Sequence, residues 1–220
     1  MAAQYALIAL LFVTVSLLVR AKLSDDRRRE YICKPASTAL VIAIALLSLL
    51  KANAQVGYTL AIALGLILSL GGDVALMFRT NRWFLIGLVL FLLAHVVYAI
   101  GFTVPNGFHS GDLVAGALLL ALGAAMFAFL RPGLGRMTGP VLLYVVVILF
   151  MVSRAISTFF GAYFSPTQAW LVTIGAILFM LSDLLLAINR FRRPFKAEAY
   201  GLFLYYAGQL LIALSPSYFR

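Results

Sequence analysis

Two aspartates lie inside apolar segments of the chain, Asp73 in LILSLGGDVALMF and Asp183 in AILFMLSDLLLAI. A carboxylate at bilayer depth costs about 2.5–3.5 kcal/mol on insertion scales, so it persists where it is paired, faces water or takes part in a reaction. Two carboxyl groups can divide acid and base work, because one can donate a proton while the other stabilises a cation and activates water. Asp73 and Asp183 are therefore the candidate catalytic residues.

The composition indicates a multi-pass membrane protein. The chain has 220 residues, of which 64% are hydrophobic and 11% charged, and its mean hydropathy is +1.06. Soluble domains are nearer half apolar and a quarter charged. The net charge of +10 arises mainly from short loops between apolar segments, which indicates contact with membrane lipids and argues against a nucleic-acid partner. A single cysteine, Cys33, excludes an internal disulfide and a cysteine-based metal site.

Apolar windows of membrane-spanning length predict an all-α polytopic membrane protein with eight transmembrane helices. The windows fall at about 4–20, 35–50, 56–78, 83–103, 112–130, 138–158, 168–189 and 198–215. Together they make one integral membrane domain over residues 1–220. The first is expected to be a retained helix rather than a signal peptide, and Pro35 is expected in the first turn of the second.

The loop charges predict the orientation in the membrane. Fourteen of the 17 Lys and Arg residues lie in or beside the loops after the first, third, fifth and seventh helices. These loops are expected to be cytoplasmic, with both termini on the opposite side; if the source is bacterial, the membrane is the inner or cell membrane. Arg154, near the outer end of the sixth helix, is expected to extend to the interface. Asp112 and Glu198 are expected to favour the dipoles of the helices that they begin.

A weak internal repeat relates two segments, GDVALMFRTNRWFLIGLVLFLLAHVVY and SDLLLAINRFRRPFKAEAYGLFLYYAGQLLI. Each has a small residue, Asp, an apolar turn, a basic loop and an aromatic-rich helix. This order predicts parallel halves of four helices each, at about 1–103 and 112–220, with a site at their interface. The counterparts are Asp73 with Asp183 and His95 with Gln209.

The polar residues also fall at matching depths. At 1.5 Å per residue, Asp73 and Asp183 lie roughly 9–10 Å inside the basic residues that follow them, and His95 and Gln209 roughly 20 Å inside. Hydroxyl groups on the same helices come from Tyr98 and Tyr205. A polar rim is expected at the cytoplasmic mouth, formed by Lys34, Arg79, Asn189 and Arg190. A single-chain lipid would suit such a cavity, with its phosphate at the rim and its chain in the apolar depth.

The strings SLGGDVALMF…GLVLFLLAHVVY and GAILFMLSDLLLAINRF…YYAGQLLIALS, together with the pair Lys34-Pro35, resemble the lysoplasmalogenase (YhhN-like) family of membrane proteins. The resemblance implies hydrolysis of the vinyl-ether bond of lysoplasmalogens to a fatty aldehyde and glycerophosphoethanolamine or glycerophosphocholine. Its partner would be a single-chain ether lysophospholipid, and a homodimer is compatible with the sequence. The family's acidic residues correspond to Asp73 and Asp183, and its polar pattern to Lys34, His95, Ser182, Asn189 and Gln209.

The proposed two-aspartate chemistry requires no metal and no organic cofactor, and the acid and base assignment stays open. On the residues alone, a proton- or cation-coupled transporter of a small amphiphile ranks equally with an enzyme. Transporters of this kind usually break helices at the midplane, whereas here only Gly71-Gly72 is a candidate break. An intramembrane aspartyl protease would need glycine at Leu70. The family resemblance favours the hydrolase.

Overall fold

The computed structural model describes residues 2–78, 80–193 and 198–219, and these residues form eight α-helices. The helices are α1 (Ala2–Leu23), α2 (Arg27–Leu46), α3 (Val56–Met77), α4 (Asn81–Asn106), α5 (Gly111–Leu130), α6 (Thr138–Ser157), α7 (Pro166–Phe191) and α8 (Glu198–Leu214). Short 3₁₀ turns follow α2, α5 and α8. Of the residues considered in the sequence analysis, Arg79 and the side chain of Glu198 lie outside this description.

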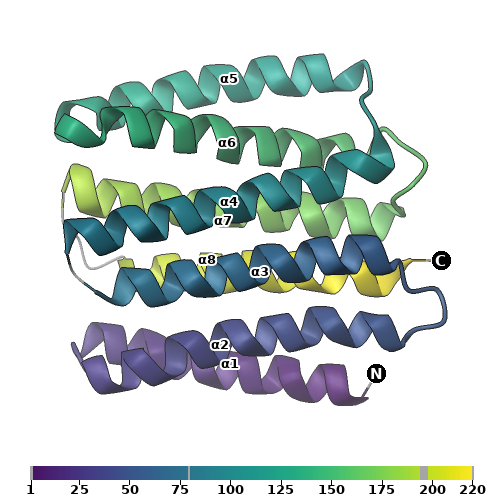
Figure 1. Ribbon diagram of the computed structural model, residues 1–220, viewed down its shortest axis with the longest axis horizontal. Coiled ribbons are helices and arrows are strands. Elements are labelled where there is room, and N and C mark those ends of the chain that lie inside the picture. The colour runs from purple at the N-terminus through teal and green to yellow at the C-terminus, as the bar shows by residue number, and fades with distance from the viewer. Residues whose placement is uncertain (1, 79, 194–197, 220) are drawn as a thin grey trace.

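Helices that follow one another in the chain run in opposite directions, and most of them pack in two layers (Figure 1). One layer contains α2, α3 and α4, the other contains α1, α8 and α7, and the α5–α6 hairpin lies beyond α4 and α7. Both termini lie at one end of the bundle, while the connections after α1, α3 and α5 lie at the other. The basic loops are therefore gathered at a single end, as the charge pattern predicts.

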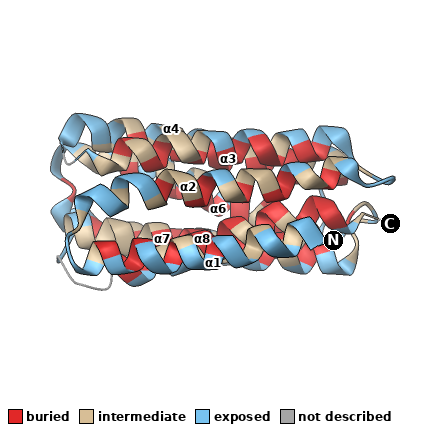
Figure 2. Ribbon diagram, turned by 90° about the horizontal axis from the view of Figure 1, so that it is seen from below, coloured by how far each residue is buried: buried red, intermediate tan, exposed pale blue. Residues whose placement is uncertain are grey.

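Seven of the described helices, α1 to α7, are long and apolar enough to cross a membrane by length and composition. Helix α8 has 17 residues and runs alongside α7. Buried residues line the faces that the helices turn toward one another, and exposed residues lie along the outer faces (Figure 2). The prediction of an all-α, polytopic membrane protein is confirmed.

The predicted start of the second helix is wrong. Helix α2 begins at Arg27, so Pro35 lies within the helix instead of its first turn. The carboxylate of Asp26 caps this start by accepting a hydrogen bond from the backbone N–H of Arg29 at 3.1 Å, and Glu30 favours the helix dipole. These signals begin the helix before the apolar run, and the ring of Pro35 removes only one intrahelical hydrogen bond.

The prediction that Arg154 extends to the interface is also wrong. Its side chain is buried, and its Nη1 lies 2.6 Å from Oδ2 of Asp112. Its Nε donates to the hydroxyl of Thr103 at 2.9 Å, and its remaining nitrogen donates to the carbonyl of Gly107. Asp112 does begin α5, where it accepts the backbone N–H of His109, and it also neutralises the arginine. This ion pair joins α4, α5 and α6 at the end of the bundle away from the basic loops.

A reciprocal glycine contact sets the distance between α7 and α8. A Cβ added to Gly208 would lie 2.7 Å from the carbonyl oxygen of Gly175, and one added to Gly175 would lie 2.8 Å from the carbonyl oxygen of Gly208. Backbone atoms cannot rotate away as a side chain can, so both positions require glycine at this spacing. Small residues allow helices in membranes to approach in this way.

The division of the chain into two parallel halves of four helices each stays a prediction.

We expect Gly208→Ala to destabilise the protein, because the new methyl group would force α7 and α8 apart. A loss of about 1–3 kcal/mol in the free energy of unfolding is typical of such overpacking. Gly116→Ala is the matched control, since no atom lies within 4 Å of its added Cβ on α5. Thermal unfolding in detergent should show a lower midpoint for the Gly208 variant alone. Equal midpoints for the two variants would contradict the close packing.

Candidate active site

A polar cavity of about 650 Å³ occupies the half of the bundle next to the basic loops. Side chains from α2, α3, α4, α7 and α8 line it, and Lys22 of α1 and Asp25 of the following loop lie at its mouth. Asp73 and Asp183 both belong to this lining. The structure therefore brings the two candidate carboxyl groups to one shared space.

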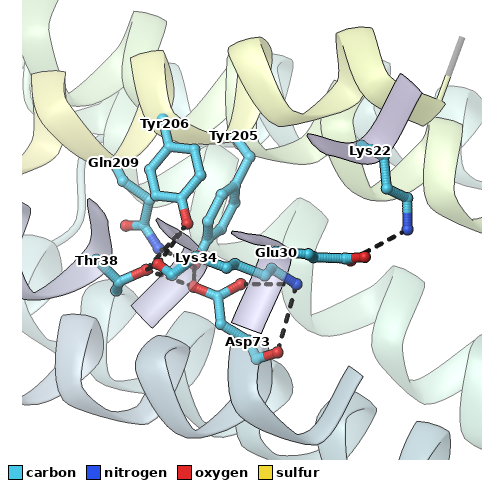
Figure 3. Close-up of polar contacts among 8 residues, drawn as sticks. All are labelled: Lys22, Glu30, Lys34, Thr38, Asp73, Tyr205, Tyr206 and Gln209. Carbon is cyan, nitrogen blue, oxygen red and sulfur yellow. Dashed lines mark hydrogen bonds and ion pairs between the residues drawn. The ribbon is translucent and has the colours of Figure 1, made fainter. Parts of the chain in front are cut away.

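The carboxylate of Asp73 is almost completely enclosed by donors from α2 and α8. Its Oδ1 lies 3.3 Å from the ammonium of Lys34, and its Oδ2 accepts hydrogen bonds from Thr38 at 2.6 Å and Tyr205 at 2.8 Å (Figure 3). The side chain of Asp73 is only 2% exposed. A cation and two hydroxyl donors favour the ionised form of a buried carboxyl group, so this site is arranged to hold a carboxylate.

A second row of side chains fixes these donors. The hydroxyl of Tyr206 donates to the backbone carbonyl of Lys34 at 2.9 Å, and Gln209 donates to the hydroxyl of Tyr205 at 3.3 Å (Figure 3). Tyr98 in turn donates to the amide oxygen of Gln209 at 2.9 Å. The network runs from α2 through α8 to α4, so Tyr205 is oriented by contacts on both of its sides.

Asp183 has different surroundings. The phenol of Tyr144 on α6 donates a hydrogen bond to its Oδ2, and Nε2 of His95 lies 3.7 Å from the same oxygen. That separation exceeds a hydrogen bond, and neither ring nitrogen of His95 has a hydrogen-bond partner among the described residues. The polar neighbours of Asp183 are thus a phenol and an imidazole, where Asp73 has an ammonium.

Aromatic rings separate the two carboxyl environments. The ring of Phe179 packs against His95 at a centroid distance of 4.6 Å and against Tyr205 at 5.2 Å. Phe91 packs edge-on against both Phe179 and Tyr205. Since Phe91 also lines the cavity, it forms the wall that a molecule inside would contact between the two aspartates.

The structure places the predicted site residues in two groups. Seven of them line the cavity, namely Asp73, Asp183, Lys34, Ser182, Asn189, Arg190 and Tyr205. His95, Tyr98 and Gln209 are fully buried in the layer beneath it. The predicted rim position of Lys34 is wrong, since this residue is buried against Asp73, whose charge would otherwise be unpaired. Arg190 does lie at the mouth, where it donates to the amide oxygen of Asn81.

Sequence reasoning missed Thr38 as a site residue, although it makes the shortest recorded hydrogen bond to Asp73. A lone threonine in an apolar run carries no signal of its own. The spacing of Thr38 from Lys34 is a signal, because residues four apart share one face of a helix.

Among the described residues, no group of three His, Cys, Asp or Glu side chains could hold a metal ion.

The sequence pattern of the YhhN family matches residues 29–216. The chain belongs to the YhhN family. It is 37% identical over 158 residues to the Bos taurus protein named "Lysoplasmalogenase TMEM86A", with 70% of this chain and 64% of that protein covered. It is 35% identical to the Homo sapiens protein of the same name, with the same coverage.

A more distant relative is the Dictyostelium discoideum protein named "Lysoplasmalogenase homolog", 24% identical over 210 residues, with 78% of this chain and 68% of that protein covered. This chain spans a little less than two thirds of the length of the two mammalian relatives. No solved structure matches it. The recognised family pattern includes both aspartates and the helices that carry their partners.

We expect Lys34→Met to destabilise this YhhN-family protein strongly, because it leaves the Asp73 carboxylate buried without its cation. Breaking one side of a buried ion pair typically costs about 3–5 kcal/mol. The double variant Lys34→Met/Asp73→Asn should regain most of that loss, since no uncompensated charge remains. Denaturant titration in detergent micelles measures these free energies.

The matched control for this cycle is Lys22→Met, which removes a more exposed ion pair with Glu30 at 3.3 Å. Its expected cost is only about 0–1 kcal/mol. If the loss in unfolding free energy of the double variant equalled the sum of the losses of Lys34→Met and Asp73→Asn, the two side chains would not be coupled.

Proposed function

We propose that this protein is a membrane-embedded lysoplasmalogenase, which hydrolyses the vinyl-ether bond of a single-chain ether lysophospholipid. The products are a fatty aldehyde and glycerophosphoethanolamine or glycerophosphocholine. The names of the mammalian relatives support this activity. The observation that carries the mechanism is the pair of carboxyl groups on one cavity, one held by an ammonium and the other by a phenol.

The two surroundings support an assignment of roles. Asp73 faces Lys34 and two hydroxyl donors, so it is the carboxylate that stabilises positive charge and accepts a proton from water. Asp183 lies beside apolar and aromatic side chains and contacts a neutral phenol, so it is the acid that donates the first proton. Glycosidases divide the work of two carboxyl groups in a similar way around an oxocarbenium-like transition state.

The reaction balances in three steps. Asp183 protonates the β-carbon of the vinyl ether, which leaves an oxocarbenium ion between two carboxylates. Water then adds to the cationic carbon and gives its proton to Asp73, which forms a hemiacetal. In the last step Asp73 protonates the ether oxygen while Asp183 takes the hydroxyl proton, so the carbon–oxygen bond breaks to aldehyde and alcohol. Both carboxyl groups return to their starting forms.

The mouth of the cavity suits a zwitterionic headgroup. It contains the cations Lys22 and Arg190 as well as the carboxylates of Asp25 and Glu30. A phosphate can interact with the first two, and an ammonium group with the second two. With the basic loops on the cytoplasmic side, this mouth opens to the cytoplasm, which also supplies the water for hydrolysis.

The activity is tested by incubating the purified protein with lysoplasmalogen and measuring aldehyde release through a coupled dehydrogenase. Asp73→Asn and Asp183→Asn keep the side-chain size but remove the acid, so each should lower the rate by at least about 10²–10⁴-fold. Asp26→Asn is the control, because asparagine also caps helices and Asp26 lies outside the cavity lining. Full activity in either of the first two variants would refute the two-carboxylate mechanism.

Hydrolysis in D₂O tests the proton transfer to carbon. The scheme places one solvent deuteron on the carbon next to the aldehyde group, because that carbon is the β-carbon of the vinyl ether. Mass spectrometry of the aldehyde, trapped by reduction as it forms, should show one deuterium bound to carbon from the solvent. An aldehyde without this label would mean that cleavage begins elsewhere. No aldehyde from any headgroup class would reject the hydrolase altogether.

A further inference from the structure

A narrow apolar crevice lies beside the polar cavity, mainly between α4, α5, α6 and α7. Its volume is about 50 Å³, compared with about 650 Å³ for the cavity. Apart from Tyr144 and Asp183, the side chains that line it are apolar, and they include Met126, Val145, Ile148 and Met180. The reaction scheme above assigns no role to this space.

The crevice and the cavity meet at Asp183. Five residues line both spaces: Leu76, Phe84, Phe91, Asp183 and Leu186. Asp183 is the polar member of this shared set. Asp73, in contrast, lines the cavity and does not line the crevice. One carboxyl group therefore lies at the boundary between a polar and an apolar space, and the other lies within the polar space.

A lysoplasmalogen has a boundary of the same kind at its reactive bond. The vinyl ether joins an aliphatic chain on one side to a glycerophosphate on the other. A glycerophosphate bound in the polar cavity leaves the chain to enter the apolar crevice, because methylene groups favour an environment without water. The vinyl-ether carbons then lie at the junction, next to Asp183, where the scheme requires the first proton.

We propose that this crevice binds the aliphatic chain beyond the vinyl-ether carbons, and that Val145 on α6 helps to determine which chains are accepted. The proposal rests on the proposed function, since it uses the same substrate. The small volume and apolar lining of the crevice suit an aliphatic chain and not a charged headgroup. Val145 is 7% exposed and lines the crevice, whereas the adjacent Val146 is 54% exposed on the outer face of the same helix.

The pair Val145→Phe and Val146→Phe tests the crevice with one chemical change at two neighbouring positions. We measure kcat and KM with a hexadecenyl and a butenyl lysoplasmalogen. Val145→Phe should raise KM for the long chain by about tenfold or more relative to the short chain, because the ring fills the path of the chain. Val146→Phe should leave the ratio unchanged. Retained turnover of the short chain shows that the Val145 variant is folded.

A binding experiment without turnover gives a second readout. The probe is a saturated alkyl-ether lysophospholipid, which cannot be hydrolysed at a vinyl ether, with a diazirine in the alkyl chain several carbons from the ether oxygen. Photolysis with the native protein should label peptides of α5 and α6, and Val145→Phe should reduce that labelling. Labelling confined to α2 and α8 would overturn the proposal even if Val145→Phe did not fold.

The outcomes separate the two proposals. Equal effects of Val145→Phe on both chain lengths, with aldehyde still released, overturn the crevice and leave the hydrolase in place. Labelling of α6 without aldehyde release from either substrate rejects the hydrolase, and the crevice then stands as a site for the chain of an ether lysolipid.

Discussion

The ion pair between Lys34 and Asp73 is the interaction on which the rest of the site depends. Neither charge can be left alone at this depth, because an unpaired ion in a low-dielectric medium is far more costly than a matched pair. The pair fixes α2 against α3, and the hydroxyl groups of Thr38 and Tyr205 satisfy the second carboxylate oxygen. Helix α8 is held to the same group, so three helices converge on a single carboxylate.

The other carboxyl group is positioned by different forces. Asp183 is carried by α7, whose backbone approaches α8 closely at Gly175 and Gly208. Its hydrogen bond from Tyr144 ties it to α6, on the side away from Asp73. The rings of Phe91 and Phe179 fill the space between the two environments. Two aspartate side chains thus have different surroundings because each is contacted by a different set of helices.

Much of this arrangement was predictable from the sequence. Apolar run lengths gave the number of helices, and Asp73 and Asp183 stood out because charged residues are rare in such runs. Contacts between helices were not predictable, because they depend on how the helices rotate and pack. Lys34 was therefore placed at the rim instead of beside Asp73, and Arg154 at the interface instead of beside Asp112. Periodicity could not place the start of α2 either, since a polar cap and not an apolar pattern begins that helix.

The buried layer beneath the cavity has a consequence for the membrane as an insulator. His95, Tyr98 and Gln209 are each completely shielded from solvent, and they cross the bundle below the level of the two aspartates. The lining of the cavity does not extend to this layer, so water that filled the cavity would leave the transmembrane voltage to fall mainly across the other half of the protein. Asp73 and Asp183 then lie close to the electrical potential of the solution that they face. A cavity closed in this way can admit water to part of the bilayer depth while the ion gradients across the membrane are preserved.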